Sequence, residues 1–352
     1  MNLLDDERTL REGDASGMLR TIAGLARHCR EGYALGLDAV DLPSASGVEN
    51  LAFCGMGGSA VAGDVLRVLV ADRLGFPVQV VRAPTLPEWC QPHTLVVISS
   101  YSGDTAEALA CFEEAVRRGC RVVVVTSGGQ LGRRAEELGL GRALVPTGFQ
   151  PRAALGYLAL GTMGALEATG LTPSVADDLK ECAHELETLA DQLAPGVPTS
   201  INAAKQVVEA IGERVPVIWG ADGLGSVAAA RWKTQMNENG KVPAFAAALP
   251  ELDHNEVVGW SQDRGHGFLV VVLRHEGEHP DVAARFELST AIAEGSGART
   301  HEVRARGRSA LARLFTLVML GDFASTYLGL ARGVDPTPVD AITRLKAALA
   351  QP

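Results

Sequence analysis

The fold is decided by the stretch LAFCGMGGSAVAG at residues 51–63. It begins with a short apolar run, passes through a turn of glycines and ends in small residues that fit a helix. It therefore predicts a strand, a tight turn and a helix. Glycine and serine allow backbone N–H groups and a hydroxyl to converge on one anion, and the N-terminus of the following helix adds a favourable dipole. The stretch predicts a phosphate-binding turn, although an ordinary tight turn of an α/β protein has the same pattern.

A second stretch of this kind, LVVISSYSGDT, occupies residues 95–105. Neither stretch is a P-loop, because no Gly-Lys-Ser/Thr sequence closes it. The first stretch is also not a clean dinucleotide-binding fingerprint, since its third glycine is misplaced and no acidic residue for a ribose obviously follows. Two hydroxyl-rich turns after successive strands favour a phosphate held by neutral donors rather than by a lysine.

The composition is that of a soluble globular protein. The 352 residues suffice for two domains, and 47% of them are hydrophobic. A net charge of −10 argues against non-specific binding to nucleic acid or to an anionic membrane surface. The six cysteines lack metal-binding spacing, so we expect buried free thiols in a reducing cytoplasm. The acidic N-terminus lacks the apolar region of a signal peptide, and we expect no membrane-spanning stretch of about 20 apolar residues.

Apolar periodicity divides the chain into two similar halves. Residues 1–45 read as helical, residues 50–145 alternate strands with helices, and a second alternation begins at residue 215. Such alternation predicts a parallel sheet covered by helices on both faces, with ligands beyond the carboxyl ends of the strands. The turn GADGLGS at residues 220–226 repeats the first turn without its hydroxyl cluster, so only the first half is expected to bind phosphate.

These patterns also place the domain boundaries. The stretch Pro195-Gly196-Val197-Pro198 is the best candidate for a linker. We expect an N-terminal helical segment at 1–45, a phosphate-binding domain at 46–195, a second domain at 196–334, and a C-terminal helix within 335–352.

Four polar residues outside the turns are candidates for chemistry, and each also has an ordinary structural interpretation. Arg152 is placed at the start of a helix, where the dipole disfavours a cation unless it pairs with an anion. Glu238 ends a helix, against the dipole, which suits a group that takes up and releases a proton. His254 lies in a dense polar run after a strand, and Lys346 lies on an amphipathic C-terminal helix. The run HEGEH at 275–279 has metal-binding residue types, but its position favours a polar turn.

Six segments in this order resemble the bifunctional phosphoglucose/phosphomannose isomerases of archaea and some bacteria. They are GMGGSAVAGD (55–64), SSYSGDTAEAL (99–109), PRAALGYL (151–158), NENGKVPAF (237–245), ELDHNEVVGW (251–260) and DPTPVDAITRLK (335–346). The resemblance runs over nearly the whole chain, and only the first two segments would recur across sugar isomerase (SIS) proteins in general. It implies an α/β fold of two SIS-type, flavodoxin-like, doubly wound parallel-sheet domains of similar topology.

The resemblance also implies roles for particular residues. The substrate phosphate would be bound by four hydroxyls and by the backbone of the first turn, namely Ser59, Ser100, Ser102, Thr105, Gly57 and Gly58. Arg152 would stabilise the negative charge of an enediolate, and Glu238 would move the proton between C2 and C1 of the sugar. His254, reaching the site from a partner subunit, and Lys346 would assist ring opening.

Two positions bear on substrate choice. The family's second loop more often reads Ser-Gly-Asn-Thr, and Asp104 replaces that asparagine here. A negative charge beside a phosphate weakens binding unless the carboxylate points away or accepts backbone N–H bonds. Thr337 is a candidate for the threonine linked to mannose-phosphate activity in the family.

Together these observations predict an aldose–ketose isomerase that interconverts glucose 6-phosphate and fructose 6-phosphate, and also mannose 6-phosphate, through a cis-enediolate. The scheme uses no metal or cofactor, and it places the protein in the cytoplasm as a homodimer, in glycolysis and gluconeogenesis. Three alternatives stay open at this point. They are a non-catalytic sugar-phosphate sensor, an isomerase for another sugar phosphate, and a structural protein with plain turns.

Overall fold

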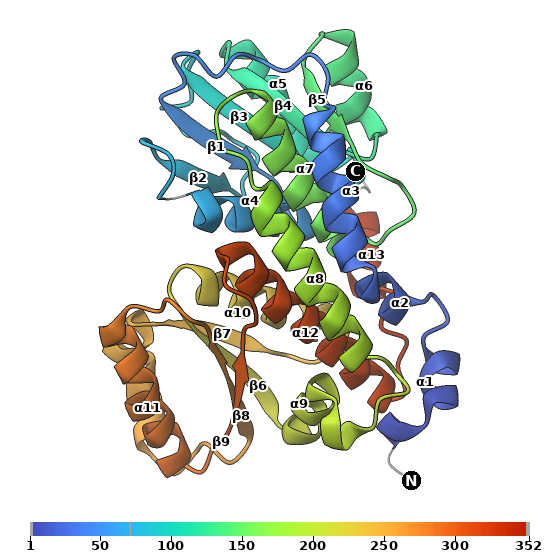
Figure 1. The fold of residues 1–352 in the computed structure, drawn as a ribbon, viewed down its shortest axis with the longest axis vertical. Coiled ribbons are helices and arrows are strands. Elements are labelled where there is room, and N and C mark those ends of the chain that lie inside the picture. The colour runs from blue at the N-terminus through green and yellow to red at the C-terminus, as the bar shows by residue number, and fades with distance from the viewer. Residues whose placement is uncertain (1–2, 71, 350–352) are drawn as a thin grey trace. The chain divides into compact units, whose positions relative to one another are not determined.

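The computed structural model describes residues 3–70 and 72–349, and it contains two parallel β-sheets (Figure 1). One sheet has five strands in the order β2-β1-β3-β4-β5, and the other has four in the order β7-β6-β8-β9. In both, the first strand lies between the second and the third, which is the flavodoxin-like order. The predicted α/β class and the repetition of one topology in two halves are therefore confirmed.

The chain forms two compact units, which are described separately below. The N-terminal unit comprises residues 24–186 and 307–313, and the C-terminal unit comprises the described parts of 1–23, 187–306 and 314–352. Each unit thus contains a segment from the far end of the chain. In the N-terminal unit this segment is anchored by Glu181, whose carboxylate accepts the backbone N–H groups of Arg308 (2.6 Å) and Ser309 (3.0 Å). The predicted domain boundaries after residues 45, 195 and 334 remain a prediction.

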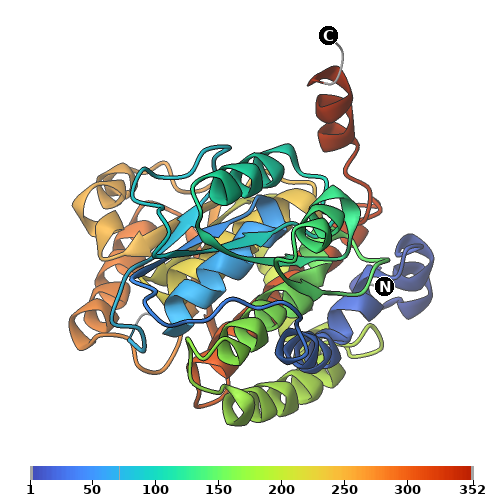
Figure 2. The same cartoon turned by 90° about the horizontal axis from the view of Figure 1, so that it is seen from above.

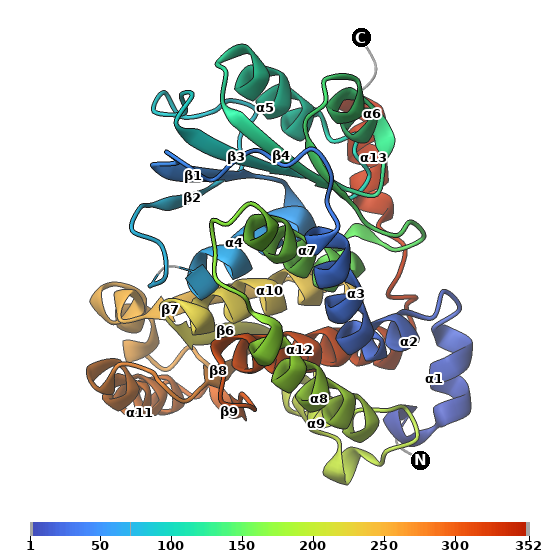
Figure 3. The same ribbon diagram turned by 45° about the horizontal axis from the view of Figure 1, so that its top comes forward.

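The N-terminal unit is built around the five-stranded sheet. Its elements are α3 (Leu25–Leu37), β1 (Asn50–Cys54), α4 (Gly57–Val70), β2 (Val78–Val81), β3 (Thr94–Ser99), α5 (Ala106–Arg117), β4 (Arg121–Thr126), α6 (Gly129–Glu137), β5 (Gly141–Leu144), a 3-10 turn η2 (Pro151–Ala154), α7 (Leu155–Ala168) and most of α8 (Ala176–Gln192). Every residue of β3 is buried, as expected of a central parallel strand covered on both faces. Helices α5 and α6 cover one face, and α4 and α7 cover the other (Figure 3).

The first helical region ends earlier than residue 45. Helix α3 stops at Leu37, and the chain then runs outside regular structure to β1, with a single bridge between Val40 and Arg142. Pro43 lacks a backbone N–H and disfavours a helical conformation at the residue before it, so a helix cannot continue through to residue 45. Helices α3 and α7 pack closely, because a Cβ at Gly36 would lie 2.2 Å from the carbonyl oxygen of Gly161.

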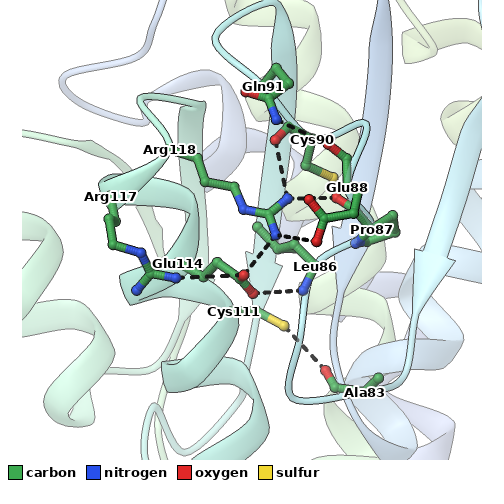
Figure 4. Close-up of polar contacts among 10 residues, drawn as sticks. All are labelled: Ala83, Leu86, Pro87, Glu88, Cys90, Gln91, Cys111, Glu114, Arg117 and Arg118. Atoms are coloured by element: carbon green, nitrogen blue, oxygen red, sulfur yellow. Dashed lines mark hydrogen bonds and ion pairs between the residues drawn. The ribbon is translucent and has the colours of Figure 1, made fainter.

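The connection from β2 to β3 contains no helix and is instead tied to α5 (Figure 4). The carboxylate of Glu114 accepts the backbone N–H of Leu86 at 2.8 Å and pairs with Arg118. Arg118 in turn donates to the carbonyl oxygen of Pro87 at 2.8 Å. The hydrogen bond from the backbone N–H of Leu86 to the Glu114 carboxylate is the main reason that the pKa of Glu114 is lowered. The loop therefore holds α5 from the side, while the N-terminus of α5 stays at the carboxyl edge of the sheet.

The C-terminal unit is built around the four-stranded sheet. Its elements are η1 (Leu3–Asp5), α1 (Glu7–Gly13), α2 (Met18–Ala23), η3 (Thr199–Ile201), α9 (Ala203–Ile211), β6 (Val215–Ala221), α10 (Leu224–Glu238), β7 (Phe245–Leu249), η4 (Glu251–His254), η5 (Glu256–Ser261), β8 (Phe268–Arg274), α11 (Pro280–Gly295), β9 (Arg299–Arg304), most of α12 (Ala310–Ala331) and α13 (Asp340–Leu349). Phe286 and Ala293 of α11 pack on one face of the sheet, and α9 and α10 lie on the other (Figure 1).

Helix α12 corrects one expectation from the sequence. Its 22 residues are long and apolar enough to cross a membrane, with a mean hydropathy of 1.5 in an 18-residue window, so such a stretch does exist. However, 94% of that window is buried inside the structure. A helix that is apolar on all sides and covered on all sides is the core helix of a globular protein. All six cysteines are free and buried, as predicted.

Candidate functional site

The first predicted phosphate turn packs directly on the segment that carries Arg152. Gly57 begins α4 with a φ of +52°, which favours glycine. A Cβ at the next residue, Gly58, would lie 3.0 Å from the Cα of Arg152 and 3.0 Å from the carbonyl oxygen of Pro151. Contacts this short are tighter than most Cβ contacts, so a side chain here would push the backbone of η2 away by a few tenths of an ångström. The glycine therefore favours the close approach of η2 to the N-terminus of α4.

The two hydroxyl-rich turns are joined by hydrogen bonds. The hydroxyl of Ser59 accepts the backbone N–H of Tyr101 at 3.2 Å, which links the first turn to the second. Within the second turn, the hydroxyls of Ser100 and Thr105 lie 3.0 Å apart, and Ser100 also accepts the N–H of Gly103 at 3.2 Å. Thr105 is the N-cap of α5, yet its side chain makes no capping hydrogen bond. The first turn of α5 therefore presents backbone N–H groups at the sheet edge, which is a favourable place for an anion.

The structure also shows what Asp104 does. Its carboxylate accepts the backbone N–H of Gln130 at 3.0 Å, in the first turn of α6. A carboxylate is stabilised at that position by the helix dipole. The backbone N–H of Asp104 donates to the hydroxyl of Ser102, an exposed residue, at 3.3 Å. The negative charge that departs from the family pattern is thus used to cap a neighbouring helix.

Arg152 lies in η2, behind Pro151 at the first helical position, and only 3% of it is exposed. The loop before η2 is held by Tyr101 of the second turn. The Tyr101 hydroxyl donates to the carbonyl oxygen of Pro146 at 3.0 Å and accepts the N–H of Phe149 at 2.9 Å. The N-terminal unit therefore gathers Ser59, Ser100, Thr105 and Arg152 along one edge of its sheet.

An aromatic cluster lies beside this loop. His28 stacks on Tyr157 with ring centroids 4.8 Å apart and meets the edge of Phe149 at 5.0 Å. Its Nδ1 is buried and has no hydrogen-bond partner among the described residues. Burial lowers the pKa of His28 to about 4. Burial, followed by the hydrogen bond to Glu31, raises the pKa of Tyr157 to about 12. Both groups are therefore neutral at physiological pH.

In the C-terminal unit, Glu238 is the last residue of α10 and is half-buried. It lines a cavity of about 570 Å³ together with Asn237, Lys241 and the segment around residues 334–342. Helix α10 is fixed to α12 by a buried bidentate pair between Arg231 and Asp322, with nitrogen–oxygen distances of 2.8 and 3.1 Å. One residue after Glu238, the buried side chain of Asn239 donates to the hydroxyl of Ser325 at 3.1 Å. These contacts fix the C-terminal end of α10, which carries Glu238, to α12.

The other two predicted residues of this unit are exposed. His254 ends η4, next to Asp253, which accepts a hydrogen bond from Ser289 of α11 at 2.6 Å. Lys346 lies on α13, whose described side chains are exposed from residue 341 to residue 348; this helix is the red one next to the C-terminus in Figure 2. Neither residue is among those that line the Glu238 cavity. The structure therefore does not bring Glu238, His254 and Lys346 together within this unit.

The run at residues 275–279 forms a polar turn, as predicted. The backbone N–H of His275 donates to the carboxylate of Glu278 at 2.9 Å, and that carboxylate pairs with Arg274. His279 caps α11 by accepting the N–H of Asp281. Among the described residues, 3–70 and 72–349, no group of three potential metal ligands is gathered.

The fold and the matched family model define the class of protein. A family model described as the bacterial phospho-glucose isomerase C-terminal SIS domain matches residues 200–349. Among solved structures, a hypothetical protein from Thermus thermophilus has the same fold, with a TM-score of 0.74, 20% identity, and coverage of 97% of this chain and 93% of that one. The protein is thus a two-unit SIS protein.

Two relatives identify the family within this class. The chain is 35% identical over 336 residues to the bifunctional phosphoglucose/phosphomannose isomerase of Caldicellulosiruptor bescii, covering 95% of this chain and 99% of that protein. It is 36% identical over 304 residues to the protein of the same name from Aquifex aeolicus, covering 86% and 90%. The chain therefore belongs to the bifunctional phosphoglucose/phosphomannose isomerase family, and it is an enzyme of the aldose–ketose isomerase class.

Two residues with clear structural roles at these sites were not predicted from the sequence. Tyr101 joins the second turn to the loop before Arg152. The feature of the sequence that could have indicated this role is that Tyr101 is a single aromatic residue among small hydroxyl-bearing ones. Lys241 lines the Glu238 cavity, and its signal was that only five of the 32 basic residues are lysines.

Proposed function

We propose that the chain interconverts glucose 6-phosphate and fructose 6-phosphate, and also acts on mannose 6-phosphate. The observation that carries the proposal is the gathering of Ser59, Ser100, Thr105 and Arg152 along one sheet edge of the N-terminal unit. Neutral hydroxyls and helix N-termini suit a phosphate, and a buried guanidinium suits a developing oxyanion. The names of the two relatives support the choice of substrates.

Phosphate binding is assigned to the N-terminal unit. The hydroxyls of Ser59, Ser100, Ser102 and Thr105 donate to the phosphate oxygens, together with the backbone at Gly57 and Gly58. The resulting anchor orients the rest of the sugar, so that part of the entropy cost of the reaction is met on binding. Because Asp104 caps α6, its charge is compatible with this anchor.

Proton transfer is assigned to Glu238. In the open-chain aldose, its carboxylate takes the proton from C2, and the electron pair of that C–H bond forms the C1–C2 double bond of a cis-enediolate with negative charge on O1. Arg152 stabilises this charge. The proton is then returned to C1 while the hydroxyl proton of O2 passes to O1, which yields the ketose. Rotation about C2–C3 presents either face of C2 to the base, and this accounts for two epimeric aldoses.

Ring opening is assigned to His254 and Lys346. Both side chains are exposed in the described chain, and the proposal has His254 act in the site of a partner subunit of a homodimer. The scheme needs no metal or cofactor. We place the enzyme in the cytoplasm, in glycolysis and gluconeogenesis.

The proposal is tested with the purified protein, treated with EDTA, and fructose 6-phosphate. Glucose 6-phosphate and mannose 6-phosphate are measured separately, and the reaction is repeated in D₂O. Formation of both aldoses, with solvent deuterium at C2, supports the bifunctional isomerase and the enediolate route. Glucose 6-phosphate alone removes the mannose activity from the proposal. Binding of fructose 6-phosphate without turnover supports a sugar-phosphate sensor instead.

The shared site is tested by mixing two inactive variants, Glu238→Gln and His254→Ala, after subunit exchange. If His254 acts across the interface, each mixed dimer contains one site with both residues intact, and about a quarter of the wild-type activity returns. If both residues act within one chain, the mixture stays inactive. Sedimentation of the wild-type protein as a monomer at assay concentration contradicts the shared site directly.

A further inference from the structure

We propose that Lys241 is a positioning residue that fastens the segment leading into α13 to the C-terminal end of α10, and thereby holds one wall of the Glu238 cavity in place. The catalytic consequence of this contact rests on the proposed function. The contact itself is tested independently of that function.

The ammonium group of Lys241 joins two parts of the chain that lie almost 100 residues apart. Its Nζ donates to the carbonyl oxygen of Glu238 at 2.5 Å, to that of Pro336 at 3.0 Å and to that of Pro338 at 2.5 Å. An ammonium group has three N–H donors, and here three carbonyl oxygens converge on it. We call this set of contacts the Lys241 clamp.

The clamp supplies hydrogen-bond donors to the segment Pro336-Thr337-Pro338, whose prolines have no backbone N–H of their own. Prolines have no backbone N–H, so a Pro-x-Pro segment joins neither a helix interior nor a central strand. The segment lies outside regular structure between α12 and α13, and the N–H of Thr337 donates to the carboxylate of Asp335 at 2.9 Å. The carbonyl oxygens of the two prolines accept hydrogen bonds from Lys241, which lies three residues after the end of α10.

A lysine suits this position better than an arginine. Only five of the 32 basic residues of the chain are lysines, and this is one of them. A compact ammonium on a flexible stem can satisfy three converging oxygens, whereas a planar guanidinium fork cannot. The positive charge also lies at the C-terminal end of α10, where the dipole favours it. The backbone of Lys241 has a φ of +55°, an unusual value for a residue with a side chain, and the clamp holds it there.

The Lys241 clamp affects Glu238, the candidate base, because Lys241 and Pro338 of the clamp line the same cavity as Glu238. One of its three acceptors is the carbonyl oxygen of Glu238 itself. Glu238 and Lys241 form one side of the cavity, and residues 334–342 form the other. Loss of the ammonium group therefore frees the second wall and removes a fixed point beside the Glu238 backbone. The same loss leaves the residues of the phosphate turns unchanged.

The first test compares Lys241→Met with a control, Lys233→Met, which removes a half-exposed lysine from the neighbouring helix α10. Hydrogen exchange is followed in peptides from residues 337–349, together with kcat for fructose 6-phosphate and the Kd of inorganic phosphate. We expect exchange in this segment to become at least tenfold faster and kcat to fall at least tenfold, while Kd changes less than twofold. The control is expected to match the wild type.

Two outcomes overturn the proposal. One is a Lys241→Met variant with wild-type exchange in residues 337–349. The other is faster exchange throughout α10 and the four-stranded sheet, with kcat, KM and Kd all changed, which indicates a general structural role. If the wild-type protein does not turn over fructose 6-phosphate, the proposed function fails, but the exchange measurement still decides whether the clamp exists.

A rescue experiment separates the ammonium group from the side-chain volume. Lys241→Cys, treated with 2-bromoethylamine, regains a primary ammonium at nearly the original distance. The six native cysteines are buried, so the new exposed thiol is the one that reacts. We expect kcat and slow exchange to return after alkylation, and Lys241→Arg to restore neither. A fully alkylated protein that stays impaired contradicts the clamp.

Discussion

The two sheet units have the same strand order but use the turn after their first strand in opposite ways. In the N-terminal unit, the turn GMGGS places Ser59 where its hydroxyl contacts the second turn, and the neighbouring Gly58 admits the backbone of Arg152. In the C-terminal unit, the turn GADGLGS closes on itself. Ser226 donates to the carbonyl oxygen of Gly223 at 3.0 Å, and a Cβ at Gly220 would lie 2.3 Å from the carbonyl oxygen of Gly225.

The difference shows that one topology can serve two tasks. The carboxyl edge of a parallel sheet is a good place for an anion only when donors remain available there. In the turn GADGLGS, the hydroxyl of Ser226 donates within the turn itself, and the carboxylate of Asp222 adds a negative charge that opposes an anion. That unit instead carries Glu238 at the far end of α10. Under the proposed function, anion binding belongs to one unit and proton transfer to the other, and the following experiments test this division.

The largest effect is expected for Glu238→Gln. An amide of nearly the same shape cannot accept the C2 proton, so we expect kcat to fall by roughly 10²–10⁴-fold. The Kd of inorganic phosphate should stay within twofold, because the phosphate turns belong to the other unit. Steady-state kinetics and calorimetry measure the two quantities, with the exposed Glu287→Gln as the control. Wild-type turnover in Glu238→Gln contradicts the assignment of the base.

A smaller effect, on phosphate affinity, is expected to distinguish the turn GMGGS of the N-terminal unit from the turn GADGLGS of the C-terminal unit. Ser59→Ala removes a buried hydroxyl that we assign to the phosphate, and a hydrogen bond to a charged group contributes about 1.5–3 kcal/mol. We expect phosphate to bind roughly 10–100-fold more weakly. Ser226→Ala, the corresponding change in the second unit, should alter the Kd less than twofold. Equal losses in both variants break the comparison.

Acid should destabilise the N-terminal unit through His28. Its folded pKa, about 4, lies below the unfolded value of 6.5, so above pH 6.5 it is neutral in both states. As the pH falls below 6.5 the unfolded chain takes up a proton that the folded unit does not, and stability is lost. At pH 5 this loss is about 2 kcal/mol.

His28→Phe should remove that loss while keeping the ring stacked on Tyr157. Hydrogen exchange of peptides from residues 24–186, compared at pH 7 and pH 5, measures it after correction for the intrinsic exchange rate. An identical pH dependence in wild type and variant rules out His28 as its source.

The smallest effect is expected for Tyr101→Phe. The change keeps the buried ring but removes the hydroxyl that contacts Pro146 and Phe149, and the net contribution of such a bond is about 1 kcal/mol. Since the loop precedes Arg152, we expect kcat/KM to fall roughly fivefold, with phosphate affinity nearly unchanged. A larger loss in phosphate affinity than in kcat would show that Tyr101 supports the phosphate turns rather than the arginine.

Much of the fold could be predicted from the sequence because the strands are short apolar runs bounded by glycines. The alternation predicted over residues 50–145 is present there as strands β1 to β5, and the repeated strand–turn–helix unit indicated the second sheet. The turns were found for the same reason: a phosphate cradle needs small residues next to each other in the chain. The roles assigned to the site residues remain predictions.

The contacts that depend on distant segments could not be predicted. Nothing local to Asp104 indicates that its carboxylate caps α6, since Gln130 is 26 residues away. The membrane-like composition of α12 was missed because its apolar residues are interrupted by Thr316 and Asp322. Asp322 pairs with Arg231, which lies 91 residues away in the chain. Pro43 prevents a helix from continuing to residue 45, but periodicity alone favoured continuation, and α3 ends at Leu37.

The exchange of short end segments between the two units has a consequence for biosynthesis. Residues 3–23 are synthesised before the N-terminal unit but belong to the C-terminal unit, and the N-terminal unit lacks Arg308 and Ser309, the partners of Glu181, until the chain has grown past residue 313. At 5–20 residues per second, that wait after residue 186 lasts on the order of ten seconds. Neither unit is encoded by an uninterrupted stretch, so one cut cannot release either of them whole. All five strands of the first sheet are made early, but the two backbone partners of Glu181 are added to the nascent unit only after the intervening residues 187–306.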